Sequence, residues 1–218
     1  IEFVSKNSEE LNIKLKKTGS TNLNGDTNFN LILDGTFNSN YFTSHISDFK
    51  TITVTEDSTV TFRGQTTFNS ELINQGEIIF NYDLSSEIYY YPTLNKDFYN
   101  EGEVSGKFNL KSDLYNSSTG NISDYFYLYK NIETNINKIV NEGTISNNVY
   151  LNEDDIEFVP TQNFNFKVHG NNYNLILSAD AEFKEIISYT TFVSKNSEEL
   201  NIKLKKQSSY IKGDSNLN

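Results

Sequence analysis

The sequence predicts an all-β protein built as a β-solenoid, in which short strands wind in successive coils around one axis. Three observations support this prediction. Apolar and polar residues alternate over short stretches, as they do in half-buried strands, and no long stretch shows a convincing helical period. The composition also favours strands, with 16 Phe and 14 Tyr but almost no Ala. The third observation is a turn sequence that recurs at intervals near the length of a solenoid coil.

The recurring turn has the form strand, Asn-x-Gly, strand. It occurs at 72–78, 98–104 and 139–145, with a looser copy at 114–122, and its glycines are Gly76, Gly102, Gly120 and Gly143. These glycines stand 26, 18 and 23 residues apart, and a solenoid coil needs roughly 20–25 residues. An asparagine at such a corner can hydrogen-bond its counterpart in the next coil. We therefore expect one stacked column made by Asn74, Asn100 and Asn141. The irregular spacings leave a β-sandwich, whose turns recur about every 8–12 residues, as the alternative fold.

Strands are expected along the whole chain. The stretch 10–16 places Leu11, Ile13 and Leu15 on one face and polar residues on the other. A short helix capped by Ser8 is the alternative here, but helical spacing would leave Ile13 off the apolar face. Further strands are expected at 28–33, 50–55, 59–63, 77–80, 87–91, 104–110, 125–130, 144–151, 163–169, 172–177 and 182–192.

A long internal duplication gives the domain organisation. The fifteen residues FVSKNSEELNIKLKK, Phe3 to Lys17, return unchanged at Phe192 to Lys206, 189 positions later. We interpret residues 1–191 as one unit of a tandem repeat and residues 192–218 as the start of the next. The end of a solenoid exposes apolar side chains and unpaired backbone groups, and both need covering. We therefore predict that the duplicated strand forms the joint between successive modules, through Leu11, Ile13 and Leu15 in one copy and Leu200, Ile202 and Leu204 in the other.

Composition and motifs exclude several classes of function. A net charge of −11 disfavours nucleic-acid binding, and the absence of cysteine excludes disulfides and thiolate metal sites. No apolar run is long enough to span a bilayer. Common catalytic and phosphate-binding motifs are missing, and His45 and His169 lack the spacing of a zinc site. We expect no enzyme activity, no catalytic residue, no metal site and no cofactor. The acidic run Glu153–Glu157 is either a calcium site or a solvated loop.

Two tyrosine clusters, at 89–91 and 125–129, are the candidate binding residues. If exposed, they form a platform that stacks against sugar rings or a protein partner. If buried, they form an aromatic stack in the core, and the sequence leaves both interpretations open. The side chains of the candidate platform are Tyr89, Tyr91, Tyr125, Tyr127 and Tyr129.

The corner sequences INQGEIIF at 73–80 and IVNEGTIS at 139–146 resemble the N-x-G-x-I corners of right-handed parallel β-helix surface adhesins. That group includes the passengers of bacterial autotransporters and the β-helix regions of fungal cell-wall adhesins. The resemblance covers residues 58–151 and departs from the pattern in the aromatic-rich stretches 82–99 and 125–129. It implies a secreted, surface-anchored binding or stalk module, and it transfers no catalytic residue.

The sequence thus predicts a repeat module of a long, secreted, fibrous cell-surface protein that acts as an adhesin or a stalk. Its expected partners are neighbouring modules or copies of itself, and host or surface glycans or proteins. One alternative is a self-assembling extracellular filament or surface-layer subunit. Another is a β-helix carbohydrate-active enzyme, although such an enzyme should offer basic residues to an acidic sugar and this chain has a single arginine, Arg63.

Overall fold

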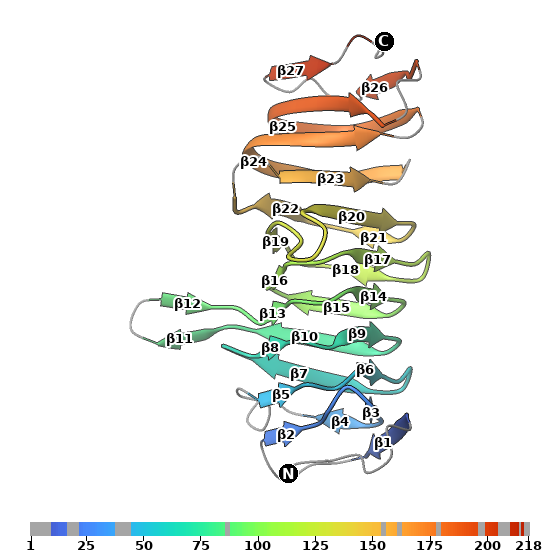
Figure 1. Ribbon diagram of the computed structural model, residues 1–218, viewed down its shortest axis with the longest axis vertical. Helices are drawn as coiled ribbons and strands as arrows, with labels where there is room; N and C mark the ends of the chain where they lie inside the picture. The colour runs from blue at the N-terminus through green and yellow to red at the C-terminus, as the bar shows by residue number, and fades with distance from the viewer. Residues whose placement is uncertain are drawn as a thin grey trace.

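The computed structural model describes residues 10–16, 22–37, 45–85, 88–153, 156–160, 163–177, 180–195, 199–204, 210–213 and 215. Within these ranges every regular element is a β-strand, which confirms the all-β class. Among the same residues there is accordingly no helix that could cross a membrane. The strands are stacked along one long axis, and almost all of them pair in parallel with a strand of the next coil (Figure 1). The fold is therefore the predicted β-solenoid and not the alternative sandwich.

The coils have three faces, which the chain visits in the order A, B, C. Face A holds β1 (Leu11–Leu15), β3 (Phe29–Leu33), β6 (Thr51–Val54), β9 (Glu71–Asn74), β14 (Phe98–Asn100), β17 (Leu114–Asn116), β20 (Ile136–Asn141) and β23 (Ile156–Pro160). Face B holds β4 (Thr36–Phe37), β7 (Thr59–Arg63), β10 (Glu77–Asn81), β15 (Glu103–Gly106), β18 (Asn121–Ile122) and β21 (Thr144–Ile145). Face C holds β2 (Asn22–Asn24), β5 (His45–Ser47), β8 (Thr67–Phe68), β13 (Thr93–Leu94), β16 (Phe108–Leu110), β19 (Phe126–Leu128) and β22 (Asn148–Leu151).

Near the C-terminal end the strands become long because they bend around the corners without a break. β24 (Asn163–Leu177) joins the two predicted strands 163–169 and 172–177, and it pairs with β22 on face C and then with β23 on face A. β25 (Ala181–Ser194) follows β24 around the same corners, with shifts of register between 164 and 167 and between 169 and 172. β26 (Ile202–Leu204) and β27 (Tyr210–Gly213) then pair with the first and last parts of β25.

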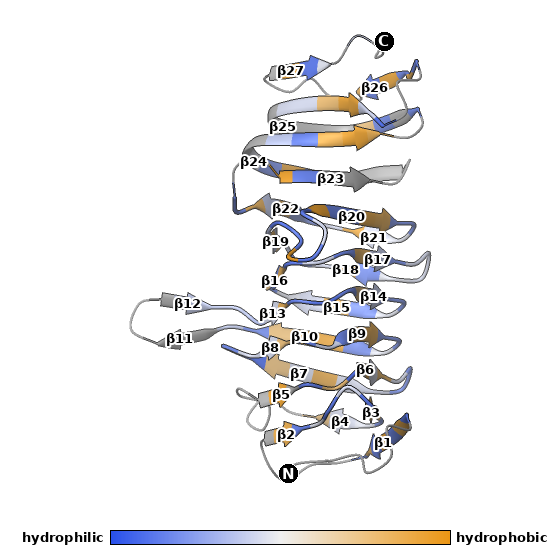
Figure 2. Ribbon diagram, viewed as in Figure 1, coloured by the Kyte–Doolittle hydropathy of each residue, from blue (hydrophilic) through white to orange (hydrophobic). Residues whose placement is uncertain are grey.

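A column of phenylalanines fills the interior of the stack. Phe108 stacks on Phe126 with ring centroids 5.0 Å apart, and Phe80 lies 4.8 Å from Phe108 on the other side. Each of these side chains is almost completely buried. Along the strands most inward side chains are apolar and the outward ones are mostly polar, as the alternation in the sequence predicts. Figure 2 shows this apolar content recurring from coil to coil.

The predicted asparagine column is present at the end of face A. Asn74 donates from Nδ2 to Oδ1 of Asn100 at 2.8 Å, and Asn100 donates in the same way to Asn116 at 2.7 Å. Asn116 donates to Oδ1 of Asn141 at 2.7 Å, and all four side chains are buried. The prediction for Asn74, Asn100 and Asn141 is confirmed, and Asn116, from the looser copy of the turn, is the fourth member.

The irregular spacing of the corner glycines comes from insertions at corners. The interval of 18 residues from Gly102 to Gly120 is a coil with short corners. The preceding interval is longer by 26 − 18 = 8 residues because it carries a hairpin, β11 (Asp83–Ser85) and β12 (Ile88–Tyr90), which projects from the stack (Figure 1). The following interval is longer by 23 − 18 = 5 residues because a loop at 129–135 precedes β20. A Cβ at Gly102 would overlap the carbonyl of Gly76, so this corner needs glycine in order for the coils to approach closely.

Candidate functional site

Aromatic side chains form a continuous row on the outside of face C. Tyr127, Tyr150 and His169 occupy matching outward positions on three successive coils. Tyr91 and Tyr125 lie at the corner that leads into this face, and Tyr82 and Tyr89 belong to the base and second strand of the projecting hairpin. We call the set the aromatic stripe: Tyr82, Tyr89, Tyr91, Tyr125, Tyr127, Tyr150 and His169.

The rings of the stripe touch one another along its whole length. The rings of Tyr89 and Tyr91 are stacked and nearly parallel, with centroids 6.4 Å apart, and the Tyr91 ring lies 5.5 Å from that of Tyr127. Tyr127 packs against Tyr150 at 5.6 Å, and His169 stacks on Tyr150 at 5.0 Å. Each ring is therefore held by its neighbours, which leaves little rotational freedom to be lost when a ligand binds.

The stripe is partly exposed and has a lysine beside it. Tyr89 is 56% exposed and Tyr82 is 40% exposed, whereas the rings on face C are half-buried against one another. Nζ of Lys107 lies 4.4 Å from the centre of the Tyr125 ring, and its hydrogen bond with Tyr125 raises the lysine pKa. Burial raises the pKa of Tyr127 above its usual range, and a hydrogen bond with Tyr125 adds to the rise. The hydroxyl of Tyr127 therefore stays neutral at physiological pH.

Strand alternation explains why the tyrosines face outward. In β19 the side chains of Phe126 and Leu128 point into the core, so Tyr125, Tyr127 and Tyr129 point away from it. The structure brings together four of the five predicted platform residues. Tyr129 stands apart from the stripe, where the ammonium of Lys111 lies 5.3 Å from its ring.

Sequence reasoning missed Tyr82, Tyr150 and His169. Tyr150 could have been found from the matching of the coils, because it follows the Gly143 corner by seven residues, as Tyr127 follows Gly120.

A second aromatic pair lies on face A. Tyr99 and Tyr115 stack with centroids 4.7 Å apart, and Lys138 approaches Tyr115 at 5.2 Å. Burial raises the pKa of Tyr99 to about 12, and the neighbouring carboxylate of Asp97 adds to the rise. A shallow pocket of about 210 Å³ lies beside this pair. Because binding pockets for small molecules usually measure about 300–1,000 Å³, this one is a weaker candidate than the stripe.

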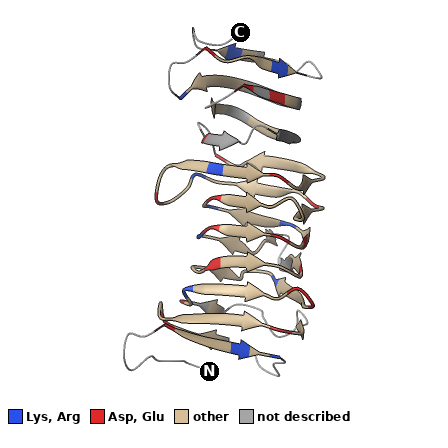
Figure 3. Ribbon diagram, turned by 90° about the vertical axis from the view of Figure 1, so that its right-hand side faces the viewer, with Lys and Arg blue, Asp and Glu red and all other residues tan. Residues whose placement is uncertain are grey.

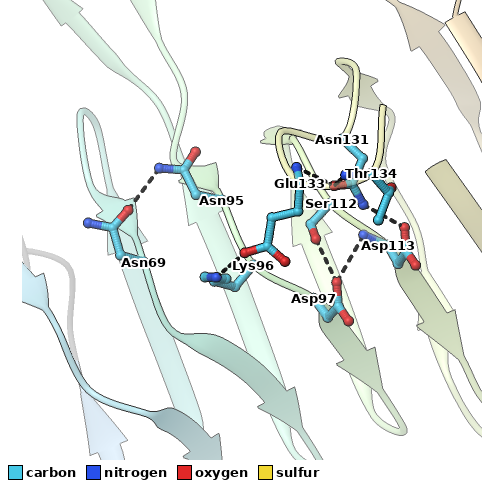
Figure 4. Close-up of polar contacts among 9 residues, drawn as sticks. All are labelled: Asn69, Asn95, Lys96, Asp97, Ser112, Asp113, Asn131, Glu133 and Thr134. Atoms are coloured by element: carbon cyan, nitrogen blue, oxygen red, sulfur yellow. Dashed lines mark hydrogen bonds and ion pairs between the residues drawn. The ribbon is translucent and has the colours of Figure 1, made fainter. Parts of the chain in front are cut away.

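The corner between faces C and A contains a dense polar cluster, drawn in Figure 4. Oδ1 of Asp97 accepts hydrogen bonds from the hydroxyl of Ser112 at 2.6 Å and from the backbone N–H of Asp113 at 3.2 Å. Oδ1 of Asp113 accepts from Nδ2 of Asn131 at 2.9 Å, and Lys96 pairs with Glu133 nearby. Ser112 is only 3% exposed, so it cannot attack a substrate as a nucleophile. These polar groups bond to one another and hold the loop at 129–135 in place.

The other candidate residues from the sequence give no assembled site within the described ranges. There, no group of three or more His, Asp or Glu side chains is placed to hold a metal ion. In the acidic run, Glu153 is exposed and Glu157 receives a long hydrogen bond from Asn174, while Asp154 and Asp155 lie outside the described residues. The side chain of His45 also lies outside them. Charged residues gather mainly at the corners and strand ends along the whole stack (Figure 3).

The two copies of the duplicated strand lie at opposite ends of the stack. In β1, Leu11 is 43% exposed, and Ile13 and Leu15 are partly buried against the core. In the second copy, Leu200 is buried, and Ile202 and Leu204 are partly buried. Each copy thus covers one end of the phenylalanine-rich interior, and its role between modules remains a prediction.

No protein-family model, curated protein or solved structure matches this chain. The candidate site therefore rests on the geometry of the chain itself.

Proposed function

We propose that this chain is a non-enzymatic module of a long, fibrous protein displayed outside the cell, and that it acts as an adhesin through the aromatic stripe. The observation that carries the proposal is the row of tyrosine rings on the outer surface of a rigid stack. Rings that are fixed in place and partly exposed, with hydroxyls at their edges, suit a ligand that offers both an apolar face and hydrogen-bonding groups.

The ligand class that fits best is an extended, uncharged glycan. Pyranose rings offer C–H faces for stacking and hydroxyls for hydrogen bonding, and a chain of them can follow several aromatic rings in a row. The net charge of −11 disfavours an acidic polysaccharide, although Lys107 supplies one cation at the stripe. A protein ligand is the competing outcome of the test below.

The stack suits the stalk function that accompanies adhesion. The buried asparagine column and the phenylalanine column run from coil to coil, so bending the stack would break contacts in its interior. The stripe is therefore presented on a stiff support, which avoids the entropy cost of ordering a flexible loop on binding.

The proposal is tested by measuring binding of the chain to an array of neutral, acidic and basic glycans. Replacing Tyr89 or Tyr127 by Ala should weaken binding to the best neutral glycan about tenfold, which corresponds to about 1.4 kcal/mol. The matched control is Tyr129→Ala, which removes an outward tyrosine directly after β19 that lies outside the stripe.

Three outcomes would overturn the adhesin proposal. They are an absence of glycan binding, an equal loss in the Tyr129→Ala control, and cleavage of the bound glycan during incubation, which would show an enzyme. The localisation has its own test, because the complete coding sequence should then encode a secretion signal and a means of surface attachment.

A further inference from the structure

The duplicated strand occupies a different face of the solenoid in each copy. In the first copy, β1 pairs with β3 on face A, with Asn12 opposite Asn30. In the second copy, β26 pairs with residues 181–183, which lie at the start of β25, before that strand reaches faces C and A. Residues 181–183 therefore continue face B, and the same sequence has moved from face A to face B.

The path of the chain after the duplicated strand preserves this offset. In the first copy the next described strand is β2, which lies on face C, two faces further on. In the second copy the next described strand is β27, which pairs with residues 189–192 on face A, again two faces further on. The two copies therefore follow the same local path, and the second is turned by one face relative to the first.

Polar contacts hold the second copy of the duplicated strand against the start of β25. The backbone N–H of Asn201 donates to Oδ1 of Asp180 at 2.8 Å, and its Nδ2 donates to Oδ2 at 3.2 Å. Nζ of Lys203 lies 3.3 Å from the carboxylate of Glu182. An acidic edge at 180–182 thus receives an asparagine and a lysine spaced two residues apart.

The first copy presents the same two side chains. Asn12 and Lys14 are the counterparts of Asn201 and Lys203, and both are exposed. On the inner side of β1 they reach Asn30 and Asp34, with Lys14 lying 2.8 Å from the Asp34 carboxylate. Within the described part of the chain, no strand pairs with the outer edge of β1.

We propose that the outer edge of β1 docks on residues 180–183 of a preceding copy of the module, through the contacts that Asn201 and Lys203 make in this chain. The proposal rests on the tandem-module function proposed above and specifies the partner of that joint. It has a geometric consequence: each module is turned by one face, about a third of a revolution, relative to the module before it.

The turn decides where the aromatic stripes of a fibre point. A stripe on face C of one module lies in line with face B of the next module and with face A of the one after. Three consecutive modules then present stripes on all sides of the fibre, so a fibre can bind a surface in whatever direction it approaches.

The test uses cysteine pairs in the full chain, which has no cysteine of its own. Facing residues of neighbouring parallel strands lie within the Cα separation that a disulfide spans. Asp180→Cys with Asn201→Cys should cross-link because β26 lies on face B, and Asn12→Cys with Asn30→Cys should cross-link because β1 lies on face A. The exchanged pair is Thr191→Cys with Asn201→Cys, whose residues lie on different faces. The disulfides of the first two pairs should form about tenfold faster than the disulfide of the exchanged pair.

Rapid cross-linking of the exchanged pair would overturn the proposal, since it would place the second copy on face A. Failure of both pairs that include Asn201→Cys would also overturn it, because the second copy would then not dock on the stack. If the Asp180→Cys variant loses its β-sheet circular dichroism, Glu182→Cys with Lys203→Cys reports on the same edge. None of these substitutions touches the stripe, so glycan binding tests the adhesin function separately.

Discussion

The asparagine column should be the part of the chain most sensitive to a single polar substitution, and Asn116→Ala tests this. Asn116 is 1% exposed, accepts a hydrogen bond from Asn100 and donates one to Asn141. In Asn116→Ala, Nδ2 of Asn100 loses this acceptor and Oδ1 of Asn141 loses this donor. A buried polar group deprived of its partner costs about 1–3 kcal/mol, so two such losses should lower the free energy of unfolding by about 2–6 kcal/mol.

A graded series separates the column from general effects of substitution. Asn74 begins the column and makes one bond within it, so Asn74→Ala should cost about half as much as Asn116→Ala. Asn95 donates to Asn69 at 2.9 Å in an exposed pair, and Asn95→Ala should therefore change stability by less than about 0.5 kcal/mol.

Urea denaturation followed by circular dichroism measures the series. The comparison requires that the free energy of unfolding depend on urea concentration with the same slope in the unmodified chain and in the three variants. Equal costs for Asn116→Ala and Asn95→Ala would refute the reasoning, because the buried column would then contribute no more than a surface contact.

Two further predictions concern aromatic residues. Phe108→Ala should cost about 3–5 kcal/mol, since the ring is fully buried between Phe80 and Phe126, and Phe108→Leu should cost less; equal midpoints in thermal unfolding would contradict this. Burial raises the pKa of Tyr99 to about 12, whereas an unfolded tyrosine has a pKa of about 10. The folded state therefore favours the neutral ring, and this contribution is complete below about pH 10 and is lost as the pH rises toward 12. Between about pH 9 and pH 11.5 the urea midpoint should accordingly fall less in Tyr99→Phe than in the unmodified chain. An identical fall in the two proteins would contradict the assignment.

The sequence was sufficient for the fold class because the corners repeat their chemistry. Coils that stack in register place Asn above Asn, so the Asn-x-Gly turns carry the architecture in a form that a linear inspection can detect. The strand of the duplicated segment was also predicted correctly, since its alternation extends over the whole stretch 10–16.

The short strands of face C could not be predicted in the same way. β8 and β13 contain two residues each, too few for an alternating pattern to appear. The stretch 104–110 was predicted as one strand but is divided between β15 and β16 by a corner at Lys107. Corners of this kind have no strong sequence signal, because their backbone is supported by the coils on either side.

The binding surface was only partly predictable for a related reason. Which tyrosines lie side by side depends on the number of residues between coils, and that number varies with insertions at the corners. Tyr91 reaches Tyr127 across 36 positions of sequence, and neither local composition nor alternation indicates such a contact.

The hairpin of β11 and β12 shows where this chain can change in evolution. It leaves the stack after β10 and returns before β13, yet β10 stays in register with β7 and β15, and β13 with β8 and β16. Mutations that lengthen, shorten or rewrite the hairpin therefore leave the coils beneath it undisturbed, whereas changes in the asparagine column do not. Natural selection can diversify the hairpin, and with it the exposed ring of Tyr89, at no cost to the stability of the stack of coils that carries it.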